Sequence, residues 1–144
     1  MDMKPMKYTQ ERIYECLYEG TIISNDNCEY KFAILSLGTH PTAYVSIPQN
    51  HPYYETYTEL DKIIECHGGI TYFDDYLGSD KYNYYRTGHW IGWDYAHYGD
   101  YIALPFFNSA AYSATSNDKR YTTEEIYSEV QDVINQLMSI KRTL

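Results

Sequence analysis

The chain has few cysteines, no long apolar run and no apolar stretch near its start. Its three cysteines, Cys16, Cys28 and Cys66, are widely spaced and form no Cys-x-x-Cys pair, so the sequence predicts neither a disulfide framework nor a structural zinc site. It contains no run of about 18 apolar residues, and residues 1–10 lack the apolar stretch of a secretory signal. We therefore expect free thiols, no membrane segment and a cytoplasmic location.

Basic residues are also scarce. Eleven lysines and arginines stand against 20 aspartates and glutamates, which gives a formal net charge of −9 at pH 7. Proteins that bind nucleic acids gain most of their affinity from basic side chains that neutralise phosphates, so we expect no direct binding to DNA or RNA. The acidic excess is typical of a soluble surface, and it also suits a protein that mimics nucleic acid.

Tyrosine is abundant, with 19 copies among 144 residues. Tyrosine rings favour half-buried strand positions, binding faces and interfaces between copies of a chain, which raises the expectation of a homo-oligomer. Hydrophobic residues make up 44% of the chain, an ordinary fraction for a globular protein. The length predicts one domain spanning residues 1–144, in which residues 1–24 form an N-terminal extension or a hairpin.

The pattern of apolar and turn residues predicts mostly strands before residue 120. We expect strands at residues 12–18 (where a short helix fits nearly as well), 30–35, 43–47, 69–73 and 90–94, with the second and third joined as a hairpin across 38–42. Residues 53–62 suit a short helix or an ordered loop. Residues 74–88 and 101–119 have no regular period and are expected to be loops, the first of a length typical of binding lids.

The C-terminal helix has the clearest signal. Thr122 and Glu125 have the spacing of a capping box. Apolar residues then recur at helical intervals, at Ile126, Val130, Val133, Ile134, Leu137 and Ile140. We expect the opposite face, with Glu129, Asp132 and Gln136, to be solvated. The fold class predicted is α+β, a small, mainly antiparallel sheet with a long C-terminal helix packed on it.

Two segments combine residues in a way that a packed core does not require. Residues 67–72 read His-Gly-Gly-Ile-Thr-Tyr, and residues 89–100 read His-Trp-Ile-Gly-Trp-Asp-Tyr-Ala-His-Tyr-Gly-Asp. Asp94, His97 and Asp100 are spaced by three, which brings side chains together on one helical turn or around a tight loop. A histidine followed by two glycines can face an open space and leave backbone amides for an anion.

These segments predict a site. The predicted catalytic residues are His67, Asp94, His97 and Asp100, because a carboxylate beside an imidazole supports general-base catalysis or holds a divalent metal; the same pairs also serve structure alone. The predicted ligand-binding residues are Gly68, Gly69, Thr71, Tyr72, Arg86 and Trp90. Trp90 is preferred to Trp93 because it shares the face of Asp94 in a strand, and Arg86 is the nearest obvious cation. Whether the protein is an enzyme stays open.

The order of these motifs resembles a family of small proteins of tailed bacteriophages and prophages. The resemblance covers residues 44–48 (Tyr-Val-Ser-Ile-Pro), 51–54 (His-Pro-Tyr-Tyr), 67–72 and 89–100. It departs from the family pattern where His89 replaces a tryptophan, Trp93 a phenylalanine and Tyr95 a cysteine, so any role of that cysteine has no counterpart here. The resemblance implies a phage accessory protein in the cytoplasm of a bacterial host, and many such proteins counter bacterial immunity.

Three functions follow as hypotheses. The first is a binding module that captures a small anionic ligand, such as a nucleotide immune signal, with glycine amides, aromatic faces and a histidine or arginine. The second is a metal-dependent hydrolase of a phosphodiester or nucleotide signal, in which the four predicted catalytic residues are ligands or base. The third is an acidic inhibitor of a host defence enzyme, acting through its tyrosine-rich surface or as a nucleic-acid mimic.

Overall fold

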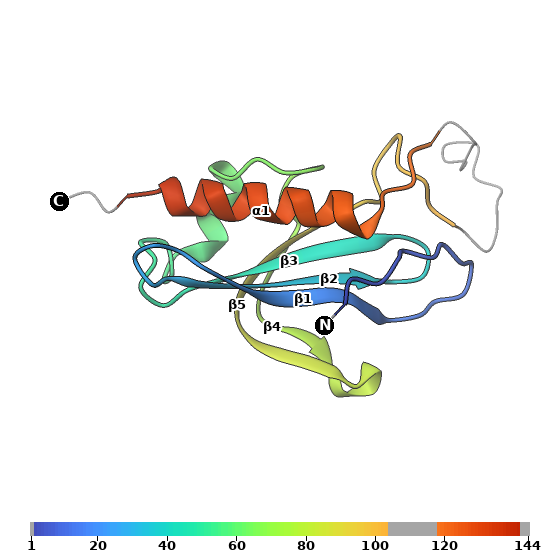
Figure 1. Cartoon of the computed structure of the whole chain (residues 1–144), viewed down its shortest axis with the longest axis horizontal. Helices are drawn as coiled ribbons and strands as arrows, with labels where there is room; N and C mark the ends of the chain where they lie inside the picture. The colour runs from blue at the N-terminus through green and yellow to red at the C-terminus, as the bar shows by residue number, and fades with distance from the viewer. Residues whose placement is uncertain (1, 104–117, 142–144) are drawn as a thin grey trace.

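A five-stranded antiparallel sheet and one long helix make up most of the computed structural model, which describes residues 2–103 and 118–141. The strands are β1 (Glu15–Ile23), β2 (Glu29–Ser36), β3 (Pro41–Ile47), β4 (Tyr72–Ser79) and β5 (Tyr84–Asp94), in the spatial order β1-β2-β3-β5-β4. Helix α1 (Thr123–Ser139) crosses one face of the sheet (Figure 1). Two short 3-10 helices are η1 (Tyr57–Lys62) and η2 (Asp80–Tyr82). The predicted α+β fold is confirmed.

The β2–β3 hairpin forms the centre of the sheet, as predicted. Phe32 pairs with Val45 and Ile34 with Ala43, and every residue of β3 is buried, because the strand is covered on both faces. The turn is closed by a hydrogen bond from the amide of Leu37 to the carbonyl of His40. Residue 38 in this turn must be glycine, because its φ is +89° and a Cβ there would lie 2.2 Å from a backbone oxygen.

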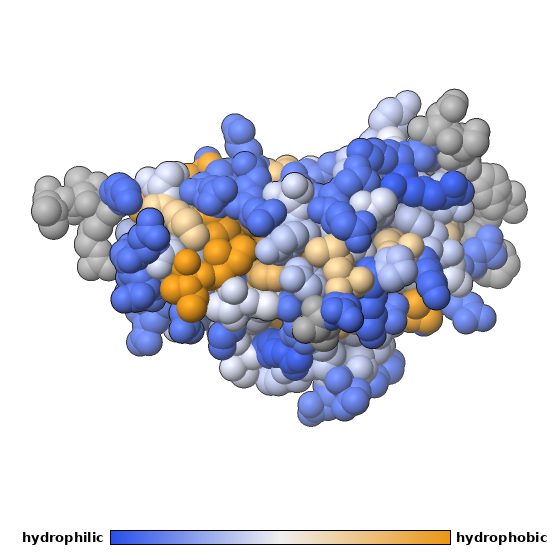
Figure 2. Space-filling model, in the orientation of Figure 1, coloured by the Kyte–Doolittle hydropathy of each residue, from blue (hydrophilic) through white to orange (hydrophobic). Residues whose placement is uncertain are grey.

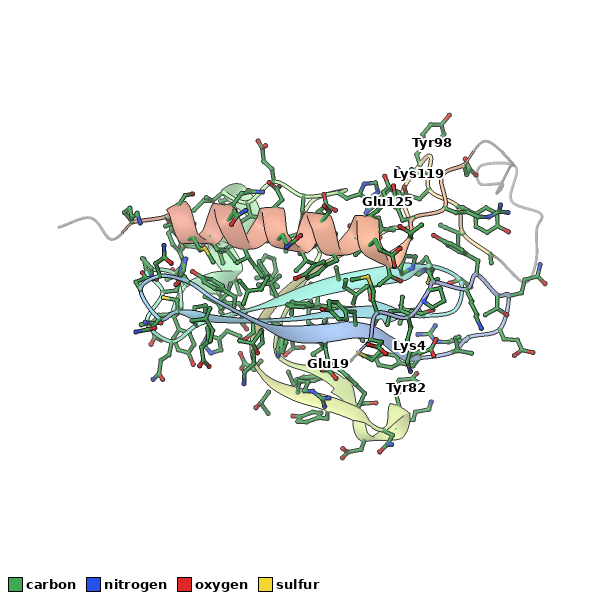
Figure 3. The ribbon with its side chains drawn as sticks, in the orientation of Figure 1. Lys4, Glu19, Tyr82, Tyr98, Lys119 and Glu125 are labelled. Carbon is green, nitrogen blue, oxygen red and sulfur yellow. The ribbon has the colours of Figure 1, made fainter. Side chains whose placement is uncertain are left out.

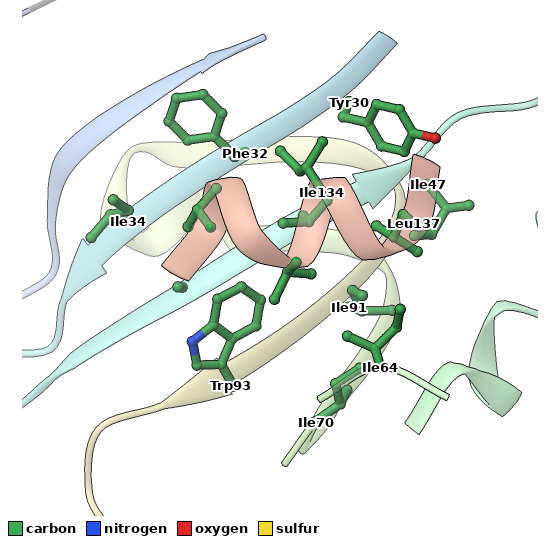
Figure 4. Packing of buried hydrophobic residues seen from close by; sticks show 14 of the residues in the cluster. Tyr30, Phe32, Ile34, Ile47, Ile64, Ile70, Ile91, Trp93, Ile134 and Leu137 are labelled. Carbon is green, nitrogen blue, oxygen red and sulfur yellow. The ribbon is translucent and has the colours of Figure 1, made fainter. Parts of the chain in front are cut away.

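Helix α1 begins with the predicted capping box. The Thr122 side chain accepts from the amide of Glu125, and the Glu125 carboxylate accepts from the amide of Thr122. The buried residues of the helix are Thr123, Ile126, Val130, Val133, Ile134 and Leu137. They pack on β2, β3 and β5, where Ile91 and Trp93 complete the main core (Figure 4). Burial of these apolar side chains is the main force that holds the helix on the sheet.

The prediction of a loop at residues 74–88 is wrong. These residues form the β4–β5 hairpin around η2, with register from Tyr72 opposite Gly92 to Ser79 opposite Tyr84. A bulge between Asp74 and Tyr76 breaks the alternation, and Tyr85, Arg86 and Thr87 are exposed in succession, so the sequence shows no clear period of two. Tyr76 of β4 and Tyr85 of β5 stack on each other, with ring centroids 5.8 Å apart.

Other boundaries differ from the predictions by several residues. The first strand starts at Glu15 and extends to Ile23, the predicted strand 69–73 begins only at Tyr72, and β5 starts six residues before the predicted position 90. Strand ends are set by pairing partners as much as by local sequence. Of the predicted irregular segment 101–119, residues 104–117 lie outside the described residues.

The β4–β5 hairpin bends away from α1 and covers the other face of the sheet (Figure 1). It encloses a second, smaller cluster of buried residues: Ala33, Leu35, Tyr44, Leu77, Tyr84 and Trp90. On the side shown in Figure 2, hydrophilic residues cover most of the surface, and apolar side chains gather below the C-terminal half of α1. Among the described residues, no helix has the length and apolar character to cross a membrane.

Candidate functional site

The chain turns sharply where β5 ends, and this turn carries three of the predicted site residues. The carboxylate of Asp94, the last residue of β5, accepts a hydrogen bond from the amide of Ala96 at 3.1 Å, the local bond that favours aspartate in turns. The amide of Asp100 then donates to the carbonyl of His97 at 2.9 Å. These bonds direct the side chains of residues 97 and 100 toward the segment that precedes β4, where His67 lies.

His67 and Asp100 form a close pair. Nε2 of His67 lies 2.7 Å from Oδ2 of Asp100, and the same oxygen accepts from the amide of His97 at 3.0 Å. Asp100 is only 3% exposed. A buried carboxylate held by two donors fixes the orientation of the imidazole.

His97 and Asp94 form a second pair beside the first. Nε2 of His97 lies 3.1 Å from Oδ1 of Asp94, and the hydroxyl of Thr71 donates to the other oxygen at 3.4 Å. The rings of His67 and His97 lie 5.8 Å apart between centroids. The structure thus brings the four predicted catalytic residues together, with Thr71 and Gly68 at their edge.

Three residues that sequence reasoning missed complete this cluster. The ring of Tyr95 stacks on His67 at 4.6 Å. Its hydroxyl donates to Glu129 of α1, which also accepts from the indole of Trp93 at 3.1 Å and from the amide of His67 at 3.1 Å. Burial and the Glu129 carboxylate raise the pKa of Tyr95, so this hydroxyl stays protonated and keeps its role as a donor.

Glu129 and Gln136 are half-buried and correct the prediction that this helix face is solvated, whereas Asp132 is exposed as predicted. Glu129 sits at the edge of the apolar stripe, directly before Val130, and three donors from other parts of the chain reach it. Gln136 of the same face also bonds to the backbone of Glu65. The position of Glu129 beside buried residues was the one sequence signal for its role.

A hollow of about 480 Å³ opens next to His67. We call it the helix-side hollow; it is lined by His67, Tyr95, Tyr121, Glu124, Glu125, Ser128 and Glu129. At its rim, Nζ of Lys119 lies 2.7 Å from Oε2 of Glu125 and 4.6 Å from the centre of the Tyr121 ring (Figure 3). Three carboxylates and two tyrosine rings make it an acidic, aromatic environment.

Two of the predicted ligand-binding residues, Arg86 and Trp90, lie elsewhere. They line a second hollow of about 490 Å³ between the β4–β5 hairpin and strands β1 and β2. We call it the hairpin-side hollow; its other lining residues are Glu19, Gly20, Thr21, Lys31, Phe32, Tyr85 and Thr87. The pleat does put Trp90 and Asp94 on one face, but Trp90 is buried in the second cluster, and Trp93 is the tryptophan that reaches the histidine cluster.

Tyr72 and Gly69, two further predicted ligand-binding residues, make hydrogen bonds within the chain. The Tyr72 hydroxyl donates to the carbonyl of Tyr76 at 2.5 Å, and its ring packs against Tyr44 at 5.2 Å. The amide of Gly69 donates to the carbonyl of Cys66 at 3.0 Å in a tight turn. That amide is therefore engaged within the chain.

The histidines and carboxylates do not form a metal-binding group. Within residues 2–103 and 118–141, no set of three or more His, Cys, Asp and Glu side chains is arranged to hold a metal ion. The donors are instead paired, His67 with Asp100 and His97 with Asp94. Burial raises the pKa of the nearby Cys66 thiol to about 12.

Comparison of the chain with protein-family models, with curated proteins and with solved structures finds no match. The geometry and charge of the two hollows are therefore the basis for assigning a function.

Proposed function

We propose that this protein is an acidic binding module that docks on a basic protein, and that its helix-side hollow receives an arginine or lysine side chain of that partner. One observation carries the proposal. Lys119 of the chain itself already lies against Tyr121 and Glu125 at the rim of the hollow. A cation over an aromatic face and beside a carboxylate is the arrangement that such a hollow favours.

The charges around the hollow favour a cation over an anion. Glu124, Glu125 and Glu129 line it, and an anionic ligand there would meet carboxylates at close range. Of the two glycine amides expected to hold an anion, that of Gly69 donates to the carbonyl of Cys66, and the preceding amide of His67 donates to the carboxylate of Glu129. A planar guanidinium, in contrast, can stack on a tyrosine ring and donate to a carboxylate at the same time.

The net charge of −9 also supports a basic partner, because its electrostatic attraction acts before the two proteins touch. An acidic surface attracts a basic partner, raises the rate of association and disfavours acidic partners. Together with the resemblance to phage proteins, this favours the hypothesis of an inhibitor that blocks a basic surface of a host defence enzyme in the bacterial cytoplasm. Such a surface is often one that binds nucleic acid.

The test uses two matched peptides, one with a central arginine and one with citrulline, which has the same shape without the charge. Nuclear magnetic resonance at physiological salt would follow the amides of His67 and Ser128 during titration. We expect saturable shifts with the arginine peptide only. Glu124→Gln should weaken binding about threefold, whereas Glu55→Gln, which removes the same charge from an exposed position outside the hollow, should have little effect.

Equal binding of the citrulline peptide would contradict the proposal. So would equal weakening by the two glutamate variants, because that result would mean general attraction to an acidic surface without a defined site.

A second candidate is hydrolysis with His67 as general base, favoured by the buried Asp100 that orients the imidazole. The substrate expected from the sequence is a phosphodiester or nucleotide signal. Incubation of the protein with cyclic dinucleotides, followed by denaturation and mass spectrometry, would reveal cleaved product for a hydrolase. Loss of product in His67→Gln with retention in His89→Gln would assign the reaction to this cluster, and intact nucleotide in all samples would reject it.

A further inference from the structure

The hairpin-side hollow is lined by a tryptophan whose buried indole donor has no acceptor among the described residues. Trp90 is 2% exposed, and among the described residues no acceptor lies within hydrogen-bonding distance of its indole Nε1. Trp93, the other tryptophan, uses its indole to donate to Glu129 and Tyr95. Buried polar groups in folded proteins are nearly always paired, so the unpaired indole of Trp90 is a feature that needs an explanation.

A glycine lies directly against this donor. A Cβ atom on Gly88 would lie 3.3 Å from Nε1 of Trp90 and 2.9 Å from the hydroxyl oxygen of Ser46. Any larger residue at position 88 would therefore crowd both polar atoms. Ser46 and Gly88 line a further hollow that shares Lys31 and Thr87 with the hairpin-side hollow, so the two hollows adjoin.

The charge here is opposite to that of the helix-side hollow. Lys31 and Arg86 both line the hairpin-side hollow, and Glu19 is its one acidic lining residue. Arg86 binds both oxygens of Glu19, at 3.2 and 3.0 Å, and Glu19 points toward the hairpin in Figure 3. The side chain of Lys31 makes no ion pair or hydrogen bond within the described part of the chain. One positive charge in this hollow is therefore uncompensated in a strongly acidic protein.

We infer that the hairpin-side hollow is a second binding site, for a small molecule that carries a phosphate or carboxylate group. An indole N–H can only donate a hydrogen bond, so the atom that satisfies Trp90 must be an acceptor. Lys31 selects an acceptor with negative charge, and the guanidinium of Arg86, which uses three of its five donors on Glu19 and Tyr85, has donors to spare. A small anionic ligand, one of the hypotheses from the sequence, therefore suits the hairpin-side hollow better than the acidic hollow beside His67.

The two indoles make a direct test possible, because a nitrogen-15 spectrum of this chain contains only two indole N–H signals. Sodium phosphate and sodium acetate would be added in separate titrations, with sodium chloride at equal ionic strength as the control. We expect the Trp90 signal to move saturably with phosphate, acetate or both, while the Trp93 signal stays in place. The anion that binds more tightly distinguishes a phosphoryl ligand from a carboxylate ligand.

Charge variants locate the site. Lys31→Gln should weaken anion binding about fivefold, and Lys62→Gln, a matched change at an exposed lysine of η1, should change it less than about twofold. The inference fails if the Trp90 signal does not move, if sodium chloride moves it equally, or if the two lysine variants weaken binding to the same extent. None of these results bears on the arginine peptide, so this site and the helix-side hollow are tested independently.

Discussion

The ring of His97 lies against the backbone of Gly68 so closely that a Cβ atom on residue 68 would come within 2.1 Å of its Nε2. Gly68 also has a φ of +70°, a conformation that disfavours other residues. Its neighbour Gly69 has a φ of +82°, but a Cβ atom added there would meet nothing within 4 Å. Two adjacent glycines thus have different reasons to be glycine, and only the first is required by the histidine cluster.

This difference predicts the effect of alanine at the two positions. Gly69→Ala should lower the free energy of unfolding by about 1 kcal/mol, the cost of a left-handed backbone. Gly68→Ala should cost at least about 1 kcal/mol more, because the His97 ring must also move. Urea denaturation of both variants measures the difference, and equal losses would mean that the ring does not pack on Gly68.

Asp100 is predicted to stabilise the cluster. Asp100→Asn weakens the bonds that His67 and the His97 amide make to a buried carboxylate, and we expect a loss of about 2 kcal/mol in the free energy of unfolding. Asp61→Asn, at an exposed position of η1, should change stability by less than about 0.5 kcal/mol. Thermal and urea unfolding provide the measurement; a loss in both variants alike would assign the effect to net charge.

His51 predicts that the protein loses stability in mild acid. It is 4% exposed; its Nδ1 accepts from the amide of Tyr53, and its Nε2 donates to the carbonyl of Leu137. Burial lowers its pKa below 6.5. Below pH 6.5 the unfolded state therefore binds a proton that the folded state does not, so the free energy of unfolding falls as the pH falls, by at most about 1.4 kcal/mol per pH unit for one group.

Unfolding measurements between pH 8 and pH 5 would show this slope, and His51→Gln should make it shallower. Burial lowers the pKa of His40 in the same direction, so part of the slope should remain. If the free energy of unfolding of His51→Gln changed with pH as steeply as that of the parent protein, His51 would not be the cause of the pH dependence.

Lys119 is predicted to compete with the basic side chain of a partner. Its ammonium group lies over Tyr121 and beside Glu125 at the rim of the helix-side hollow. Lys119→Ala should therefore strengthen binding of the arginine peptide about two- to fivefold, beyond the small general effect of one charge. Lys62→Ala gives the size of that general effect, and titration calorimetry compares the two. Weaker binding by the Lys119 variant would argue against competition at the rim.

The elements that were predicted well depend on neighbours in sequence. The capping box of α1 and the β2–β3 hairpin need only residues a few positions apart. The 94, 97 and 100 spacing likewise forms one local turn, stabilised by short-range bonds. The β4–β5 hairpin was missed because its bulge interrupts the alternating pattern.

The sequence by itself determined the net acidity, the capped amphipathic helix, the central hairpin and the turn that groups Asp94, His97 and Asp100, because each follows from composition or from contacts within a few residues. Only the tertiary structure decided that Glu129 joins His67 and Tyr95, and that Arg86 and Trp90 lie in a separate hollow. The reason is physical: the packing of α1 on one face and the bend of the β4–β5 hairpin over the other set distances between residues that are far apart in the chain. No local pattern carries that information.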